Sequence, residues 1–151
     1  MQSPLIIRPF HPADQAPARA LILAGLQEYW GTLDNTLNPD LEDLGHTYRQ
    51  GCFLIAWLAG ELVGTGAILP LDADTAQIMR MSVSHTHRRR GIGSQLLSAL
   101  VREGKNWGAR RIILETTANW LAAIRFYQSN GFRIMDYQAG DCYLEKRLPG
   151  R

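Results

Sequence analysis

A strand pattern, a glycine-containing turn and an amphipathic helix pattern follow one another between residues 75 and 107. The segment TAQIMRMSV predicts a strand that places Ile78 and Met79 on opposite faces. The turn HTHRRRGIG then leads into apolar residues at helical spacing, which predict a helix that begins at Gly91 and closes near Trp107. Because both elements have an apolar face to bury, this segment predicts a sheet with a helix packed on it.

The rest of the chain alternates in the same way. Strand patterns lie at residues 5–8, 52–58, 61–71, 110–117, 132–137 and 142–148, and the second and third of them predict a hairpin around Ala59–Gly60. Helix patterns lie after Asp14 up to Gly31, within residues 38–51, and from Asn119 to Asn130. This order predicts an α/β (α+β) fold with a mixed central sheet and helices on both faces. No repeat or linker divides the chain, so we expect one domain over residues 1–151.

Charge and cysteine content narrow the classes of function. The chain has 16 basic and 14 acidic residues and a net charge of +2, so no overall positive field favours nucleic acid. Two cysteines without CxxC spacing form neither a disulfide framework nor a redox motif, and the histidines form no metal-binding pattern, so we expect no metal. The chain shows no signal-peptide pattern and no apolar run of about 18 residues, so we expect a cytoplasmic protein without a membrane partner.

The turn before the predicted helix at Gly91 has the features of an anion site. The first backbone N–H groups of a helix lack internal partners, and the helix dipole makes that end locally positive. Gly91 and Gly93 have no side chains to keep a phosphate from the backbone, and Arg88, Arg89 and Arg90 add positive charge. Neither the P-loop nor the dinucleotide fingerprint fits, so the segment predicts a pyrophosphate cradle of another kind. A solvated basic turn is the alternative interpretation.

Three motifs in this order resemble the GNAT family of N-acetyltransferases. RRRGIG is similar to the family's acetyl-CoA signature, Q/R-x-x-G-x-G/A. ILET resembles its fifth strand, and AAIRFYQSNGF, residues 122–132, resembles the segment that follows. The resemblance covers residues 75–132. It implies a mostly antiparallel sheet of six or seven strands, with acetyl-CoA as co-substrate.

The resemblance also implies which residues contact the coenzyme. The pantetheine arm would lie between the strands matching Gln77–Val83 and Arg111–Thr116, which splay apart in the family. The diphosphate would lie on the N–H groups of the turn and of the helix start. The coenzyme-binding residues implied in this way are Met81, Ser82, Val83, Arg88, Arg89, Arg90, Gly91, Ile92, Gly93, Ser94, Asn119, Phe126 and Tyr127.

Tyr127 matches the family tyrosine that is proposed to protonate the leaving thiolate. Aminolysis of a thioester needs a neutral amine, a polarised carbonyl and stabilisation of the leaving thiolate, whose thiol has a pKa of about 8.5. A phenol of pKa about 10 can donate a hydrogen bond to that thiolate. Many family members carry a glutamate base where this chain has Gln77, and an amide cannot accept the proton. Glu115, Glu61 or a histidine would then serve as the base, or the amine would arrive already neutral. A core aromatic is the alternative interpretation of Tyr127.

The residues expected to bind the acceptor substrate are Tyr29, Gln77, Arg80 and Glu115. Together these expectations describe transfer of an acetyl group from acetyl-CoA to a primary amine of a small-molecule or amino-acid-like acceptor by direct attack. The alternatives are a protein or peptide amine acetyltransferase, a coenzyme A sensor without turnover, and a nucleic-acid binder built on HTHRRR, which the short basic cluster disfavours. The edges of the last strands could support a homodimer.

Overall fold

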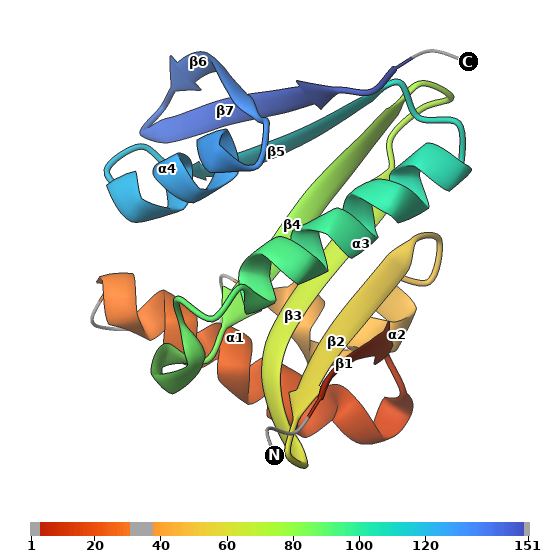
Figure 1. Ribbon diagram of the computed structural model, residues 1–151, viewed down its shortest axis with the longest axis vertical. Coiled ribbons are helices and arrows are strands. Elements are labelled where there is room, and N and C mark those ends of the chain that lie inside the picture. The colour runs from red at the N-terminus through yellow and green to blue at the C-terminus, as the bar shows by residue number, and fades with distance from the viewer. Residues whose placement is uncertain (1–3, 31–37, 150–151) are drawn as a thin grey trace.

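Seven strands form one sheet in the computed structural model, which describes residues 4–30 and 38–149 (Figure 1). The strands are β1 (Leu5–Pro9), β2 (Cys52–Leu58), β3 (Glu61–Pro70), β4 (Thr75–Val83), β5 (Arg111–Thr117), β6 (Arg133–Gln138) and β7 (Asp141–Arg147). Their order across the sheet is β1-β2-β3-β4-β5-β7-β6, and β4–β5 is its parallel pair, the other neighbours being antiparallel. The mixed, mostly antiparallel sheet expected from the sequence is confirmed.

Helices cover both faces of the sheet, as expected. The helical segments are η1 (Pro12–Asp14), α1 (Gln15–Trp30), η3 (Pro39–Glu42), α2 (Leu44–Thr47), η4 (His85–His87), α3 (Ile92–Asn106) and α4 (Leu121–Ser129). On one face, α1, η3 and α2 share a buried cluster with β2 and β3. On the other face, α3 and α4 share a larger cluster that reaches from β2 to β7, and Figure 1 shows these two helices in front of the sheet.

Two helices differ from the sequence-based expectation. The pattern within residues 38–51 forms η3 and α2 with a break at Asp43, whose backbone is not helical (φ −147°, ψ 86°) and whose Oδ1 accepts the backbone N–H of His46 at 3.1 Å. The helix expected from Asn119 begins at Leu121. Asn119 instead lies in a turn that Trp120 closes by donating its backbone N–H to Thr117 O at 3.0 Å. The Asp43 side chain therefore caps α2 and separates it from η3, whereas a backbone hydrogen bond closes the turn before α4.

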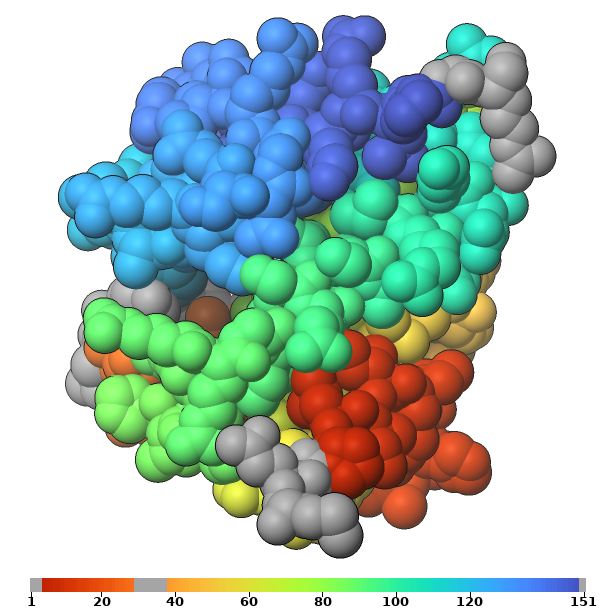
Figure 2. All heavy atoms as spheres, viewed as in Figure 1, coloured from red at the N-terminus to blue at the C-terminus, as the bar shows by residue number. Residues whose placement is uncertain are grey.

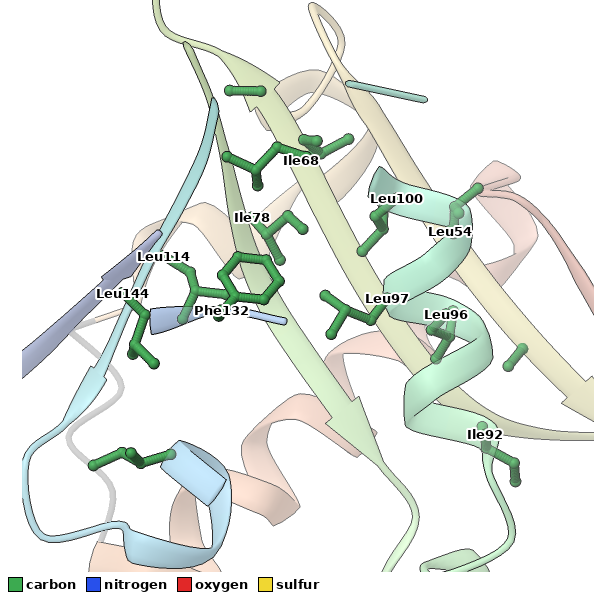
Figure 3. Packing of buried hydrophobic residues seen from close by; sticks show 14 of the residues in the cluster. Leu54, Ile68, Ile78, Ile92, Leu96, Leu97, Leu100, Leu114, Phe132 and Leu144 are labelled. Carbon is green, nitrogen blue, oxygen red and sulfur yellow. The ribbon is translucent and has the colours of Figure 1, made fainter. Parts of the chain in front are cut away.

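The packing of α3 fixes where the glycine-containing turn lies. Its residues Ile92, Leu96, Leu97 and Leu100 are at most 3% exposed and point toward the sheet (Figure 3). Figure 3 also shows Ile78, Leu114 and Phe132 across from them, so β4, β5 and the segment after α4 contribute to one cluster with α3. Because this apolar stripe holds the helix in one orientation, the N-terminal end of α3 lies beside the carboxyl end of β4.

None of the helices within the described ranges combines the length and the apolar content that a membrane span requires. The single domain over residues 1–151 and the cytoplasmic location stay predictions.

Replacing Leu100 by alanine is expected to lower the free energy of unfolding by about 2–5 kcal/mol, because the side chain is fully buried and its removal leaves a cavity. The matched control is Ser98→Ala on the exposed side of the same helix, which should change stability by less than about 0.5 kcal/mol. Urea denaturation of both variants measures the difference. Equal stabilities for the two variants would contradict the assigned packing of α3.

Candidate functional site

The parallel strands β4 and β5 pair over a short stretch and then diverge. Thr75–Gln77 pairs with Arg111–Ile113, and beyond Gln77 the edge of β4 that faces β5 has no strand partner. A cleft of about 790 Å³ occupies the gap and is lined from α1 on one face to α4 on the other. Figure 2 shows the surface hollowed between the light-blue α4 region and the green segment that leads into α3. The amides of this edge of β4 are therefore available to a ligand that enters the cleft.

A β-bulge bends β4 at the cleft. Thr65 of β3 lies opposite Ser82 and Ala67 lies opposite Met79, so β4 has one residue more than β3 between these pairs. Within the bulge Arg80 takes a left-handed backbone conformation with φ +57°. Thr65 Oγ1 donates a hydrogen bond to the Arg80 carbonyl at 2.8 Å, which stabilises this conformation from the neighbouring strand.

The Arg80 side chain, expected to contact the acceptor, binds an acid of the protein itself. Its Nε donates to Asp40 Oδ2 at 2.8 Å and its Nη2 donates to Asp40 Oδ1 at 2.7 Å. Nη2 also donates to Asn38 Oδ1 at 3.1 Å, and Tyr48 Oη donates to Asp40 Oδ2 at 2.8 Å. Arg80 still lines the cleft, but these contacts tie its guanidinium to η3, and Tyr48, the residue after α2, binds the same carboxylate.

This network shifts the pKa values of Asp40, Tyr48 and Arg80. Burial of Asp40 opposes its ionisation, but the hydrogen bonds from Arg80 and Tyr48 outweigh burial and hold the pKa of Asp40 below its ordinary value. Burial, with the Asp40 carboxylate beside the phenol, raises the pKa of Tyr48 well above its usual range. Asp40 is therefore the charged centre of the network, and Tyr48 is a neutral donor to it.

The start of α3 keeps its backbone donors available. Gly91 is the N-cap residue with φ +79°, and it has no side chain that could accept a hydrogen bond from the first N–H groups of the helix. A Cβ on Gly93 would lie 3.1 Å from Phe126 Cζ and 3.6 Å from Val83 Cγ2, so the absence of a side chain there lets both residues pack close to the backbone of α3. The N–H groups of this first turn and the positive end of the helix dipole lie where RRRGIG predicts an anion cradle, and the binding of an anion there stays a prediction.

The three arginines of the motif differ in their surroundings. Arg88 and Arg89 line the cleft, whereas Arg90 is exposed and lies outside the cleft lining. Arg88 also makes a bidentate ion pair with Glu28 of α1, in which Nη1 and Nη2 lie 2.6 Å from Oε1 and Oε2 respectively. The Arg88 guanidinium beside Glu28 holds the pKa of that carboxyl below its usual range.

The wall opposite β4 comes from α4 and β5. Phe126 and Tyr127 line the cleft, with their ring centroids 5.2 Å apart at an edge-to-face angle, and the Tyr127 ring also packs on Phe132 at 5.9 Å. Glu115 lies on β5, two residues after Ile113, and therefore on the same face of the sheet as Ile113 and its partner Gln77. The cleft thus places a phenol and a carboxylate on the β5 side.

Glu115 also affects its neighbour on the next strand. It pairs with Tyr143 of β7, and the Glu115 carboxylate raises the pKa of Tyr143 above its ordinary value.

Most of the residues predicted from the sequence meet at this cleft. Those that line it are Arg80, Met81, Ser82, Val83, Arg88, Arg89, Gly91, Ile92, Gly93, Ser94, Glu115, Phe126 and Tyr127.

Four predicted residues are not among those that line the cleft. Arg90 and Asn119 are exposed in the turns before α3 and α4, and Gln77 lies in the stretch where β4 still pairs with β5. The side chain of Tyr29, at the end of α1, falls outside the described part of the structure.

Several cleft residues have no local sequence signal. Asn38, Trp120 and Asp141 line the cleft but belong to none of the motifs that predicted it. Asp40 and Glu28 bind arginines that are 40 and 60 positions away in the sequence. Only the packing of α1 and η3 on the sheet brings these acids to the site.

Residues 4–30 and 38–149 contain no group of three or more His, Cys, Asp or Glu side chains placed to hold a metal ion. The expected absence of a metal stays a prediction.

The architecture matches solved acetyltransferases. A GNAT-family acetyltransferase from Staphylococcus aureus Mu50 superposes with a TM-score of 0.88, 23% identity, and 97% of this chain and 100% of that chain covered. The PaiA N-acetyltransferase of Thermoplasma acidophilum, solved in complex with coenzyme A, gives a TM-score of 0.85 at 19% identity, over 96% of this chain and 99% of that one. At these identities the likeness shows the fold, which is that of the GNAT acetyltransferases.

Sequence comparison shows the family to which the chain belongs. The model of the acetyltransferase (GNAT) family matches residues 18–132, and the chain belongs to this family. Human N-acetyltransferase 8 is 32% identical over 109 residues, which are 67% of this chain and 48% of that protein. Escherichia coli K12 YjgM, described as an uncharacterized N-acetyltransferase, is 30% identical over 147 residues, 92% of this chain and 87% of that protein. The chain thus spans about half the length of the human relative.

Replacing Asp40 by asparagine is expected to lower the free energy of unfolding at neutral pH by about 1–3 kcal/mol, because Arg80 and Tyr48 lose a charged acceptor. The folded-state pKa of Asp40 lies below the ordinary value of about 3.9, so this stabilisation is present above that pH and is lost as the pH falls through the folded-state pKa. Urea denaturation of both proteins at a series of pH values measures the effect.

The stability gap between wild type and Asp40→Asn should narrow below about pH 4. Asp74→Asn, at a side chain that is 69% exposed, is the control and should stay within about 0.5 kcal/mol of wild type. A gap that is missing at neutral pH, or that persists unchanged in acid, would contradict the role of Asp40.

Proposed function

We propose that the protein is an acetyl-CoA-dependent N-acetyltransferase that acetylates a primary amine of a small-molecule or amino-acid-like acceptor. The observation that carries the proposal is the unpaired edge of β4, which leads from the bulge at Arg80 to the glycine-capped start of α3 along one cleft. Membership of the GNAT family supports it.

The residues present fit coenzyme A. The N–H groups at the start of α3 would bind the diphosphate, and Arg89 at the cleft and Arg90 in the exposed turn would add positive charge around it. Met81, Ser82 and Val83 lie on the unpaired edge of β4, where backbone groups would hydrogen-bond the amides of the pantetheine arm. Bound there, acetyl-CoA would supply an acetyl thioester, and the backbone N–H groups beside the bulge would polarise its carbonyl.

Tyr127 is the proposed general acid. Phe126 and Phe132 pack on its ring edge-to-face, and these contacts fix the direction of the phenol at the cleft. A neutral phenol, with an ordinary pKa of about 10, can donate to a thiolate without ionising first.

Glu115 is the proposed general base. Gln77 stands where many family members have a glutamate, and an amide cannot accept a proton. Glu115 lies on the same face of the sheet as Gln77, is exposed and lines the cleft, so its carboxylate can take a proton from an incoming ammonium group. Arg80, which is expected to contact the acceptor, would do so while its guanidinium stays bound to Asp40.

Replacing Gly91 by glutamate is expected to weaken binding of coenzyme A by about tenfold or more, because a carboxylate at the cradle repels the diphosphate and competes for the same amides. Gly108→Glu is a matched control, since Gly108 also has a positive φ (+89°), also has open space around its Cβ, and lies after the far end of α3. Backbone strain is therefore similar in both variants. Calorimetric titration measures the dissociation constants, and equal affinities in the two variants would overturn the assignment of the cradle.

Replacing Tyr127 by phenylalanine is expected to lower turnover roughly 100-fold through loss of the general acid, while the dissociation constant of acetyl-CoA changes less than about twofold. The measurement is thiol release with amino acids, polyamines, aminoglycosides and peptides, which also identifies the acceptor class. Tyr137→Phe removes a hydroxyl from a residue of β6 that is 54% exposed and lies outside the cleft lining, and it should retain wild-type turnover. Wild-type turnover in Tyr127→Phe would exclude the acid role and leave the fold assignment intact.

A further inference from the structure

The bidentate pair between Arg88 and Glu28 joins two parts of the protein that are 60 positions apart in the sequence. Glu28 lies in the last turns of α1, and Arg88 lies three residues before the N-cap Gly91 of α3. Both side chains are 36% exposed, so solvent reaches the pair, and Arg88 is one of the residues that line the cleft.

Its position brings an acid next to the proposed diphosphate cradle. Arg88 lines the cleft, and so do Gly25 and Leu26, which precede Glu28 on α1. The α1 backbone comes close to β4 here, since a Cβ on Gly25 would lie 3.1 Å from Ser82 Oγ. The carboxylate of Glu28 is thus held at the entrance by the packing of its helix.

Carboxylates and phosphates use the same surface of a guanidinium group. Both accept two parallel N–H···O bonds from the arginine fork, and both Arg88 Nη atoms already donate to Glu28. When a diphosphate approaches Arg88, both Nη atoms already donate to Glu28, and the negative charge of Glu28 repels the diphosphate. Exposed ion pairs are weak, so an exchange of partners is feasible.

We propose that Glu28 is an internal competitor of the coenzyme diphosphate for the Arg88 fork, and that it thereby sets the coenzyme affinity of the cleft. In the coenzyme-free protein Glu28 holds Arg88, and on binding the diphosphate takes over that partner. His85 Nδ1 lies 3.7 Å from Glu28 Oε1, so the carboxylate keeps a neighbour when Arg88 leaves it. This inference rests on the proposed function, because it presumes that the diphosphate binds at the start of α3.

The competitor role predicts a gain of affinity, whereas a purely structural pair predicts a loss. If Glu28 only oriented Arg88, breaking the pair would loosen the turn and weaken coenzyme binding. If Glu28 competes, removing its charge makes the Arg88 fork available to the diphosphate and removes a repulsion. The sign of the change therefore separates the two roles.

Replacing Glu28 by glutamine is expected to tighten binding of coenzyme A by about three- to tenfold at low ionic strength, with a smaller gain at high salt. Calorimetric titration of the purified protein with coenzyme A measures the change. Glu42→Gln is the matched control, because Glu42 also pairs with an arginine, Arg19 of α1 at 3.3 Å, and Arg19, unlike Arg88, lies outside the cleft lining. Its dissociation constant should equal that of wild type.

A double-mutant cycle with Arg88→Gln tests whether the effect passes through the arginine. Arg88→Gln should weaken binding, and in that background Glu28→Gln should change affinity by less than about twofold. Unchanged or weaker binding in Glu28→Gln, or an equal gain with and without Arg88, would overturn the proposal. Failure of the wild-type protein to bind coenzyme A would instead overturn the proposed function, so the two failures are distinguishable.

Discussion

The parallel pairing of β4 with β5 ends at Gln77 and Ile113, and every other part of the candidate site depends on where it ends. A longer ladder would use the backbone groups of β4 internally and close the cleft. The two halves of the sheet stay together beyond this point because one apolar cluster joins them, with Ile78 from β4, Leu114 from β5 and the buried stripe of α3. The sheet can therefore lose hydrogen bonds at its centre without losing its core.

The bulge at Arg80 adds a second constraint to the same strand. A left-handed conformation costs a residue other than glycine about 1–2 kcal/mol, so something must hold Arg80 there. The hydrogen bond from Thr65 to its carbonyl and the Asp40 fork on its guanidinium supply that stabilisation from both ends of the residue. A bulge bends its strand, and this one bends β4 a few residues after it leaves β5.

The two ends of the cleft carry groups of opposite charge. The start of α3 presents backbone N–H groups, and Arg89 lies beside them. Gly91, the N-cap residue, has no side chain that could accept a hydrogen bond from these groups. Across the sheet, Glu115 and Asp141 line the other end of the cleft. Arg88 and Arg80 both line the cleft, and each binds an acid from the helical segments on one face of the sheet, Glu28 from α1 and Asp40 from η3.

Local pattern in the sequence predicted the strands, the helix from Gly91 to Trp107 and the anion cradle, because periodicity and backbone freedom at a glycine are properties of neighbouring residues. The resemblance to the GNAT family singled out Tyr127, and Gln77 in place of the family glutamate singled out Glu115; both residues line the cleft, and their catalytic roles stay predictions. The local patterns placed Asn119 on a helix, whereas a hydrogen bond from Trp120 to Thr117 keeps it in a turn. The partners of Arg80 and Arg88 were decided by the tertiary structure alone, since Asp40 and Glu28 lie 40 and 60 positions away and reach the site only through the packing of η3 and α1 against the sheet.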